Sequence, residues 1–146
     1  MESSLAEQRQ LWRRVVERLT ESNLVYMVSG SLASSLHGEP RMTRDIDIVV
    51  DGSADQLRSF ADSFDPATHY ETDPIEALTR RSMFTIVEVQ TGWKVDLMIR
   101  KDRAFSRTEL FRRIPATIGD IDLMVVSPED SILSKLEWMK LSGSDR

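Results

Sequence analysis

The chain has 146 residues, of which 40% are hydrophobic and 29% charged, a composition typical of one soluble globular domain. Its formal net charge of −5 argues against broad, non-specific binding of nucleic acid, so an RNA partner would have to be held by a local basic surface. The absence of cysteine excludes disulfides, zinc–thiolate sites and cysteine catalysis.

The first predicted element is an amphipathic helix, in which apolar residues recur at helical spacing over residues 5–19. The motif Ser4-x-x-Glu7 has the form of a capping box at its start. Its arginines, among them Arg14 and Arg18, alternate with glutamates, which predicts a solvent-exposed face. Charged residues near the N-terminus argue against a signal peptide. No apolar stretch approaches the roughly 18 residues of a membrane span, so we expect a cytoplasmic protein.

A buried strand is predicted at residues 24–29, where an apolar run stops at Gly30-Ser31 and leads into a short helix. Glycine lets a phosphate group approach the backbone, and the free amides at a helix start donate hydrogen bonds to it. The Ser31 hydroxyl adds one further donor. The turn is therefore a candidate phosphate-binding site.

The next strand, residues 45–50, begins with alternating acids and isoleucines, so Asp45 and Asp47 lie on one face. Their side chains start about 6.5–7 Å apart, close enough to hold a divalent cation between them. Mg²⁺ or Mn²⁺ accepts carboxylate oxygens and completes its shell with water and substrate phosphates. Two acids after a phosphate-binding turn therefore predict a metal–triphosphate site, and the adjacent Arg44 is either a phosphate contact or a surface charge.

The order of these residues resembles the nucleotidyltransferase superfamily of the DNA polymerase β type. That family carries Gly-[Gly/Ser], a spacer and Asp-x-[Asp/Glu] on a strand, and here Gly30-Ser31 and Asp45-Ile46-Asp47 stand in that order. The spacer that ends in Arg41-Met42-Thr43-Arg44 is most similar to the small stand-alone bacterial members of the AbiEii type, which are toxin-like.

Between these acids and the next strands, Ser53-x-x-Gln56 predicts a capping box and a helix to about residue 64, and Pro74 begins a short helix to residue 81. Residues 65–73 contain Asp-Pro, Thr-His and Thr-Asp pairs, which are typical of a loop. His69 lies in this stretch with no acid or cysteine at ligand spacing, so we expect a solvent-exposed loop residue.

Two β-prone runs, residues 83–90 and 93–99, predict an antiparallel hairpin joined at Thr91-Gly92. Asp96 lies in the second run, on the face opposite to its apolar neighbours. A lone aspartate on a strand is usually only exposed. The family, however, keeps its third carboxylate at this place, so the resemblance implies that Asp96 acts as a base or a metal ligand.

A second Asp-Ile-Asp triplet, residues 120–122, lies at the turn of a predicted hairpin between residues 116–118 and 121–126. No small-residue phosphate turn precedes it, so we do not assign it to the site. Upstream of the hairpin, Ser106-x-x-Glu109 predicts the start of a short helix.

The final helix is predicted to begin at Ser127-Pro128, with acids in its first turn. Lys135 in this helix is either a surface lysine or a cation directed at a triphosphate, as a lysine in the matching helix of similar proteins is.

The predicted fold is α/β (α+β in stricter usage): one domain over residues 1–146, with a mixed, twisted sheet and helices packed on it. The resemblance implies a catalytic and metal-binding set of Asp45, Asp47 and Asp96, with Gly30, Ser31, Arg44 and Lys135 around the phosphates. Since relatives commonly continue into further helix, we also expect a minimal or C-terminally truncated member.

The activity that this resemblance implies is the transfer of a nucleoside monophosphate from a nucleoside triphosphate such as ATP to a hydroxyl of tRNA or another RNA, a protein or a small molecule. The chain would then be the toxin of a toxin–antitoxin pair. The alternative is a nucleotide-binding regulatory or toxin–antitoxin partner protein with weak or no transfer. Mutually repelling carboxylates favour the enzyme, because a binding domain has no physical reason to keep them. An aminoglycoside-modifying enzyme is a third hypothesis, but the sequence indicates no second domain that would bind the antibiotic.

Overall fold

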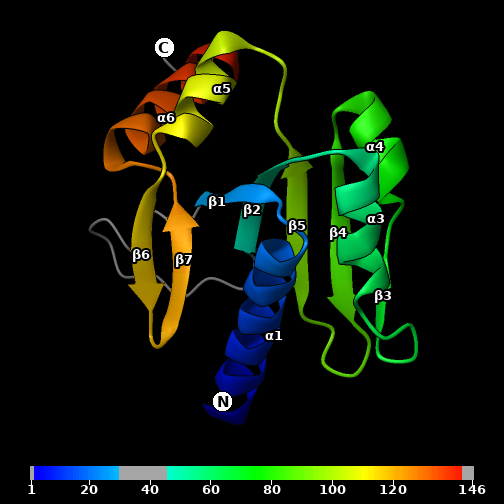
Figure 1. The fold of residues 1–146 in the computed structure, drawn as a ribbon. Helices are drawn as coiled ribbons and strands as arrows, with labels where there is room; N and C mark the ends of the chain where they lie inside the picture. Colours follow the sequence, from blue (N-terminus) through cyan, green and yellow to red (C-terminus); the bar gives the residue numbers. More distant parts are fainter. Residues whose placement is uncertain (1, 30–45, 143–146) are drawn as a thin grey trace.

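The computed structural model describes residues 2–29 and 46–142 (Figure 1). Four of the predicted site residues lie outside the described residues: Gly30, Ser31, Arg44 and Asp45. The predicted site is therefore described at Asp47, Asp96 and Lys135.

Helices and strands are interspersed along the described chain. In order they are α1 (Glu2–Glu21), β1 (Val25–Ser29), β2 (Ile46–Asp51), α3 (Ala54–Asp62), β3 (His69–Glu71), α4 (Pro74–Arg80), β4 (Met83–Glu88), β5 (Lys94–Ile99), α5 (Ala104–Phe111), β6 (Ile114–Ile118), β7 (Ile121–Val125) and α6 (Pro128–Ser142). This mixed architecture confirms the predicted fold class.

Seven strands of the described chain form one sheet, in the order β3-β4-β5-β2-β1-β7-β6. The central strand β2 pairs antiparallel with β1 and parallel with β5. Both predicted hairpins, β4–β5 and β6–β7, are antiparallel pairs and are confirmed. Their turns contain Gly92 and Gly119 with φ of 75° and 60°, values that glycine adopts without strain.

One strand of the sheet, β3, was not predicted. It lies within residues 65–73, where a loop was predicted, and pairs antiparallel with β4. Its three residues, His-Tyr-Glu, carry no alternation of apolar and polar side chains that would predict a strand. Pairing with β4 defines it, a contact that the local sequence does not encode.

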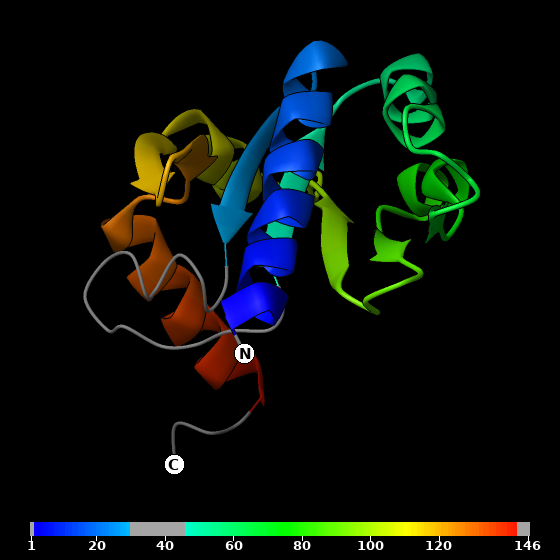
Figure 2. The same ribbon diagram turned by 90° about the horizontal axis from the view of Figure 1, so that it is seen from below.

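One face of the sheet is covered by α1, α3 and α4 (Figure 1 and Figure 2). Leu11 and Val15 of α1 and Phe60 of α3 form one core with the inward residues of the strands, among them Ile46 and Ile48. The alternate residues of β2 are half-buried on the other face. Period-two alternation in β2 thus separates the hydrophobic core from the face that carries Asp47.

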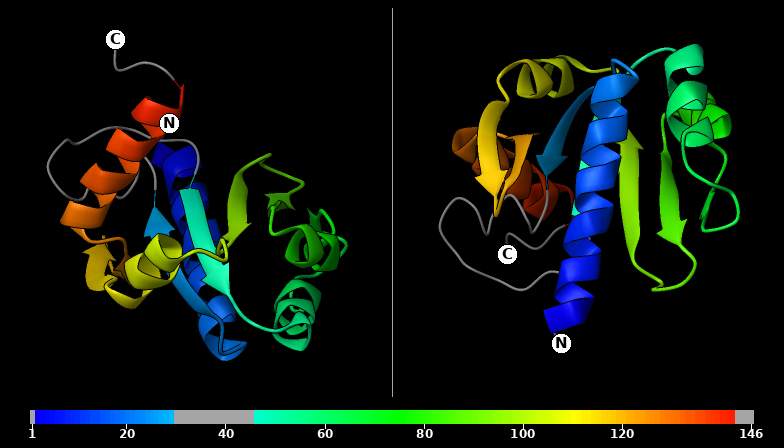
Figure 3. Two further views of the ribbon diagram at one scale, coloured as in Figure 1. Left: turned by 90° about the horizontal axis from the view of Figure 1, so that it is seen from above. Right: turned by 60° about the horizontal axis from the view of Figure 1, so that its bottom comes forward.

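Helices α5 and α6 lie close to each other (Figure 3), and Ser134 of α6 donates a hydrogen bond to Glu109 of α5 at 2.7 Å. Leu110 of α5 packs with Met27 of β1 and with Val126, in a small cluster separate from the main core. These helices therefore enclose space beside the strand face that the other three helices leave uncovered.

Three predicted helix starts are confirmed, among them that of α4 at Pro74. At α3 the capping box forms, since the Ser53 hydroxyl accepts from the Gln56 amide at 3.2 Å and the Gln56 side chain accepts from the Ser53 amide at 2.8 Å. At α6 the Ser127 hydroxyl accepts from the Asp130 amide at 3.1 Å. At α3 and α6, a side chain thus satisfies an amide that the helix leaves unpaired.

Two other predicted starts are wrong. Helix α1 begins at Glu2, where an acid is favourable at a helix start, so Ser4 lies inside the first turn. Helix α5 begins at Ala104 with Arg103 as N-cap, so Ser106 also lies inside a helix. Arg103 pairs with Glu137 of α6, and this tertiary contact lies at the start of the helix.

The predicted exposure of His69 and of two arginines of α1 is also wrong. His69 is buried, with 7% of its surface exposed. Arg14 lies within 2.8 Å of the His69 ring, and Arg18 donates to the Ser63 carbonyl at 2.9 Å while lying over the Phe64 ring. Their partners are distant in sequence, so the charge pattern of the helix alone does not predict them.

Along residues 2–29 and 46–142, none of the helices combines the length and the apolar character that crossing a membrane requires.

Candidate functional site

Four polar side chains lie in one row across the sheet. The registers of four neighbouring strands pair Thr85 with Asp96, Asp96 with Asp47, and Asp47 with Ser29. Neighbouring strands lie about 4.7–4.9 Å apart, and side chains paired across them point to the same face. Asp47 and Asp96 are therefore brought side by side, on the face away from the main core.

The two carboxylates are half-buried. The Thr85 hydroxyl donates to Asp96 Oδ1 at 2.8 Å, which fixes the orientation of that carboxylate. Two carboxylates at paired positions repel each other, and a bound cation or proton relieves the repulsion. The arrangement is typical of a site that holds a divalent cation through oxygen ligands.

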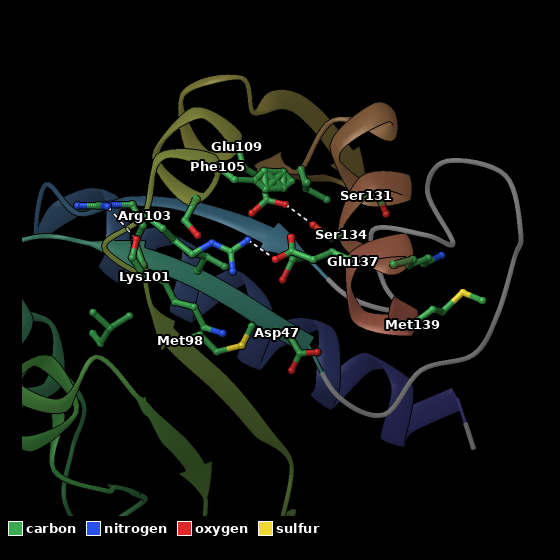
Figure 4. Close-up of a pocket in the computed structure, with 17 residues that line it drawn as sticks. Asp47, Met98, Lys101, Arg103, Phe105, Glu109, Ser131, Ser134, Glu137 and Met139 are labelled. Atoms are coloured by element: carbon green, nitrogen blue, oxygen red, sulfur yellow. Dashed lines mark hydrogen bonds and ion pairs between the residues drawn. The ribbon is translucent and has the colours of Figure 1, made fainter. Parts of the chain in front are cut away.

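A cavity of about 710 Å³ adjoins this row (Figure 4). Ser29 and Asp47 contribute to its lining from the sheet, and α5 and α6 provide residues of the facing wall. Val49, Met98 and Phe105 make part of the lining apolar. Its volume lies in the usual range for small-molecule sites, and a few polar groups in an apolar lining are typical of them.

The predicted residues differ in their relation to this cavity. Asp47 and Lys135 line it, and Asp96 adjoins it as the neighbour of Asp47. In the part of the chain that the structure describes, no group of three or more His, Cys, Asp or Glu side chains is placed to hold a metal ion. The third predicted acid, Asp45, lies outside that part.

The second Asp-Ile-Asp triplet has partners outside the cavity. The Arg13 guanidinium donates to Asp120, and this hydrogen bond holds the pKa of the Asp120 carboxyl below its usual range. Asp122 accepts from the Thr117 hydroxyl at 3.0 Å across the β6–β7 pair. Neither residue lines the cavity.

Several charged residues of the cavity were not predicted. Arg103 pairs with Glu137 across the α5–α6 contact, and Arg100 pairs with Asp51 at 3.2 Å. Burial raises the pKa of Glu109, against the opposing effect of the hydrogen bond from Ser134. One sequence signal could have indicated Glu109 as a cavity residue: it lies four residues from Phe105, and so on the same face of the helix.

A second, polar cavity of about 370 Å³ lies beside His69, Arg14 and Glu88. Arg14 reaches His69 Nε2 at 2.8 Å and donates to Glu88 at 3.1 Å. Because a guanidinium only donates, Nε2 must accept, so the proton of the neutral ring is on Nδ1, 2.8 Å from the Thr68 hydroxyl. These contacts join α1 to the edge of the sheet.

No protein-family model and no curated protein matches the chain. Its structure is similar to that of a provisionally assigned nucleotidyltransferase from Thermotoga maritima, with a TM-score of 0.63 and 17% identity over 96% of this chain and 89% of that one. It is also similar to the Helicobacter pylori protein JHP933, with a TM-score of 0.51 and 16% identity over 93% of this chain and 57% of the other. A CCA-adding enzyme in complex with ATP gives a TM-score of 0.46 and 24% identity, over 88% of this chain and 30% of that one.

The fold assignment rests on the first two likenesses. At identities of 17% and 16% they establish a common fold, and one fold hosts many activities. The activity has to be argued from the residues of the site.

Proposed function

We propose that the chain is a metal-dependent nucleotidyltransferase, which moves a nucleoside monophosphate from a nucleoside triphosphate to a hydroxyl of an acceptor. The observation that carries this proposal is the in-register pair Asp47–Asp96 beside a cavity of about 710 Å³. The fold shared with the Thermotoga maritima protein supports it. So does the sequence order of Gly30-Ser31 and Asp45 before Asp47.

The donor chemistry of the acids fits Mg²⁺ or Mn²⁺. Asp47 and Asp96 offer carboxylate oxygens from neighbouring strands, and Asp45 precedes Asp47 by two residues and would add a third carboxylate. When bound, the metal would neutralise phosphate charge and polarise the reacting phosphoryl group. Holding it is the role we give to these three acids.

The other residues bind and position the substrates. Lys135 would place a positive charge toward the phosphates from the cavity wall, and Gly30-Ser31 would donate backbone and hydroxyl hydrogen bonds to them. Arg44 is a further candidate phosphate contact. The apolar lining of the cavity would hold the nucleoside and exclude water.

The reaction forms a bond between the acceptor hydroxyl oxygen and the α-phosphorus. The bond from that phosphorus to the bridging oxygen breaks, and pyrophosphate leaves. Asp96, oriented by Thr85, is the residue that we assign to the hydroxyl side, where it would accept the proton. Such transfers depend mainly on positioning and on charge neutralisation, which acids and basic side chains around one cavity supply.

For the acceptor we propose tRNA or another RNA, a protein or a small molecule with a free hydroxyl. The resemblance to AbiEii-type proteins favours a toxin that acts in the cytoplasm beside an antitoxin partner. A single domain over residues 1–146 would carry the site.

The test is incubation of the protein with each labelled nucleoside triphosphate, Mg²⁺, total RNA and a lysate. We expect one macromolecule to gain label, and we expect Asp47→Asn and Asp96→Asn to lower transfer on the order of 10³-fold or more, because each removes a charged ligand at the reacting centre. Asp96→Asn keeps an acceptor for the Thr85 hydroxyl and removes one of two repelling charges, so it should melt at or above the wild-type temperature.

The matched control is Asp122→Asn, which makes the same change in the second Asp-Ile-Asp triplet and should leave transfer intact. If Asp122→Asn abolished transfer while Asp47→Asn spared it, the site would be wrongly placed. Nucleotide binding without transfer to any acceptor would instead support a regulatory binding protein.

A further inference from the structure

Glu109 is an acidic residue in a part of the cavity that the proposed chemistry does not use. It comes from α5, lines the cavity beside Phe105, and accepts a hydrogen bond from the Ser134 hydroxyl at 2.7 Å (Figure 4). Phe105 and Glu109 are four residues apart, so they lie on one face of the helix. An aromatic ring and a carboxylate are thereby presented to the same space.

This carboxylate has no cationic partner in an ion pair among the residues that the structure describes. Arg103, which lines the same cavity, is paired with Glu137. Burial raises the pKa of the Glu109 carboxyl, and the charges of Asp130 and Glu137 add to this rise, while the Ser134 hydrogen bond and the charge of Arg103 oppose it. A half-buried carboxylate with one hydroxyl donor gains stability from a ligand that offers further N–H donors.

The position of Glu109 relative to Asp47 and Asp96 suits contact with the base of a nucleotide. Figure 4 shows Asp47 on the strand side of the cavity and Glu109 on the α5 side, with Arg103 and Glu137 between them. A triphosphate held near Asp47 would leave the nucleoside to extend toward α5. The base would then meet Phe105 and the thioether of Met98, surfaces suited to a flat ring.

We propose that Glu109 determines base specificity by accepting a hydrogen bond from an exocyclic amino group, so that adenine, cytosine or guanine nucleotides bind in preference to uracil nucleotides. The inference rests on the proposed function, because it takes the cavity to hold a nucleoside triphosphate. Carboxylates accept from base amino groups in other base readers. Uracil has no amino group, and its single ring N–H is flanked by two carbonyl oxygens that a carboxylate repels.

The experiment measures the affinity of the whole protein, in Mg²⁺, for the non-hydrolysable α,β-methylene analogues of ATP, CTP, GTP and UTP by calorimetry. For the wild type, at least one amino-bearing analogue should bind about tenfold or more tightly than the UTP analogue. Glu109→Gln replaces an acceptor oxygen by an amide donor that uracil O4 can accept, so the preference should fall to within about threefold.

Two further variants separate this role from a structural one. Ser134→Ala removes the hydroxyl that orients Glu109 and should weaken the base preference in the same direction. Glu129→Gln removes the same charge from an exposed position outside the cavity and should leave the preference unchanged. Melting temperatures and circular dichroism check that each variant is folded.

Equal wild-type affinity for all four analogues, or a preference that survives Glu109→Gln, would overturn the role of Glu109 while leaving transferase activity to be judged by the labelling assay. A preference that disappears in Glu109→Gln, with no label transferred to any acceptor, would support Glu109 and overturn the transferase. Failure of all four analogues to bind would overturn both.

Discussion

At His69, the hydrogen bonds around the ring determine which nitrogen carries the proton. Nε2 accepts from Arg14, and Nδ1–H is directed at the Thr68 hydroxyl, so both nitrogens are engaged in the neutral form. Protonation of Nε2 would replace the Arg14 contact with repulsion. Burial and then the charge of Arg14 lower the pKa of His69, while Glu88 and Asp65 oppose the shift.

This lowered pKa makes folding stability depend on pH. Between the folded pKa and the ordinary value of about 6.5, the unfolded chain binds more protons than the folded one. The contribution of His69 is therefore complete above about pH 6.5 and is lost as the pH falls toward the folded pKa. We expect urea unfolding at pH 8, 7, 6 and 5 to show this loss.

The control for the pH series is His69→Gln, whose side-chain oxygen can accept from Arg14 and does not titrate. Its stability should decline less than that of the wild type between pH 7 and 5. His37 is present in both proteins and cancels in the comparison. Parallel pH profiles for the two proteins would show that His69 has no lowered pKa.

At the scale of the element, α3 depends on its capping box. Ser53→Ala removes the acceptor for the Gln56 amide and should lower the free energy of unfolding by about 1 kcal/mol. Urea denaturation measures the loss. Ser59→Ala, at an exposed position inside the same helix, should be neutral or slightly stabilising, because alanine is the better helix former. Equal effects of the two substitutions would contradict a capping role.

The strands could be predicted where apolar and polar residues alternate clearly along the sequence. Strands β2 and β5 bury every second side chain, and the sequence located both within about two residues. The three-residue β3 was missed because its identity comes from pairing with β4. The starts of α1 and α5 were misplaced because a serine followed three residues later by an acid also occurs inside helices.

The candidate site could be predicted in part. Alternation placed Asp47 and Asp96 on the polar faces of their strands, but only the sheet order and the register bring the two together. Glu109 and Ser134 lie on separate helices, and nothing local in the sequence indicates their contact. Residues that meet through tertiary packing, His69 and Arg14 included, escaped prediction for the same reason.

At the scale of the whole molecule, a ligand that binds only the folded chain stabilises all of it. We expect Mg²⁺ or Mn²⁺ together with a nucleoside triphosphate to raise the melting temperature, by an amount equivalent to about 2.7 kcal/mol at 100 times the dissociation constant. Neither component alone should have the same effect, because each completes the binding site of the other. Thermal scans at millimolar concentrations measure the shift.

Asp47→Asn is the control for this stabilisation, since it removes an acid proposed to hold the metal. Its melting temperature should respond little to the combination. A wild-type melting temperature that does not move under the same conditions would count against the metal–nucleotide site, whatever acceptor the protein uses.

The parallel pairing of β2 with β5 also has a kinetic consequence. Between these strands the chain passes through α3, β3, α4 and β4, so a long loop must close before Asp47 meets Asp96. Helices and hairpins form from neighbours in sequence, whereas a pairing across a long loop loses more chain entropy and is slow to form. A partly folded chain can therefore hold most of its secondary structure without an acid pair, which confines the proposed chemistry to molecules that have completed folding.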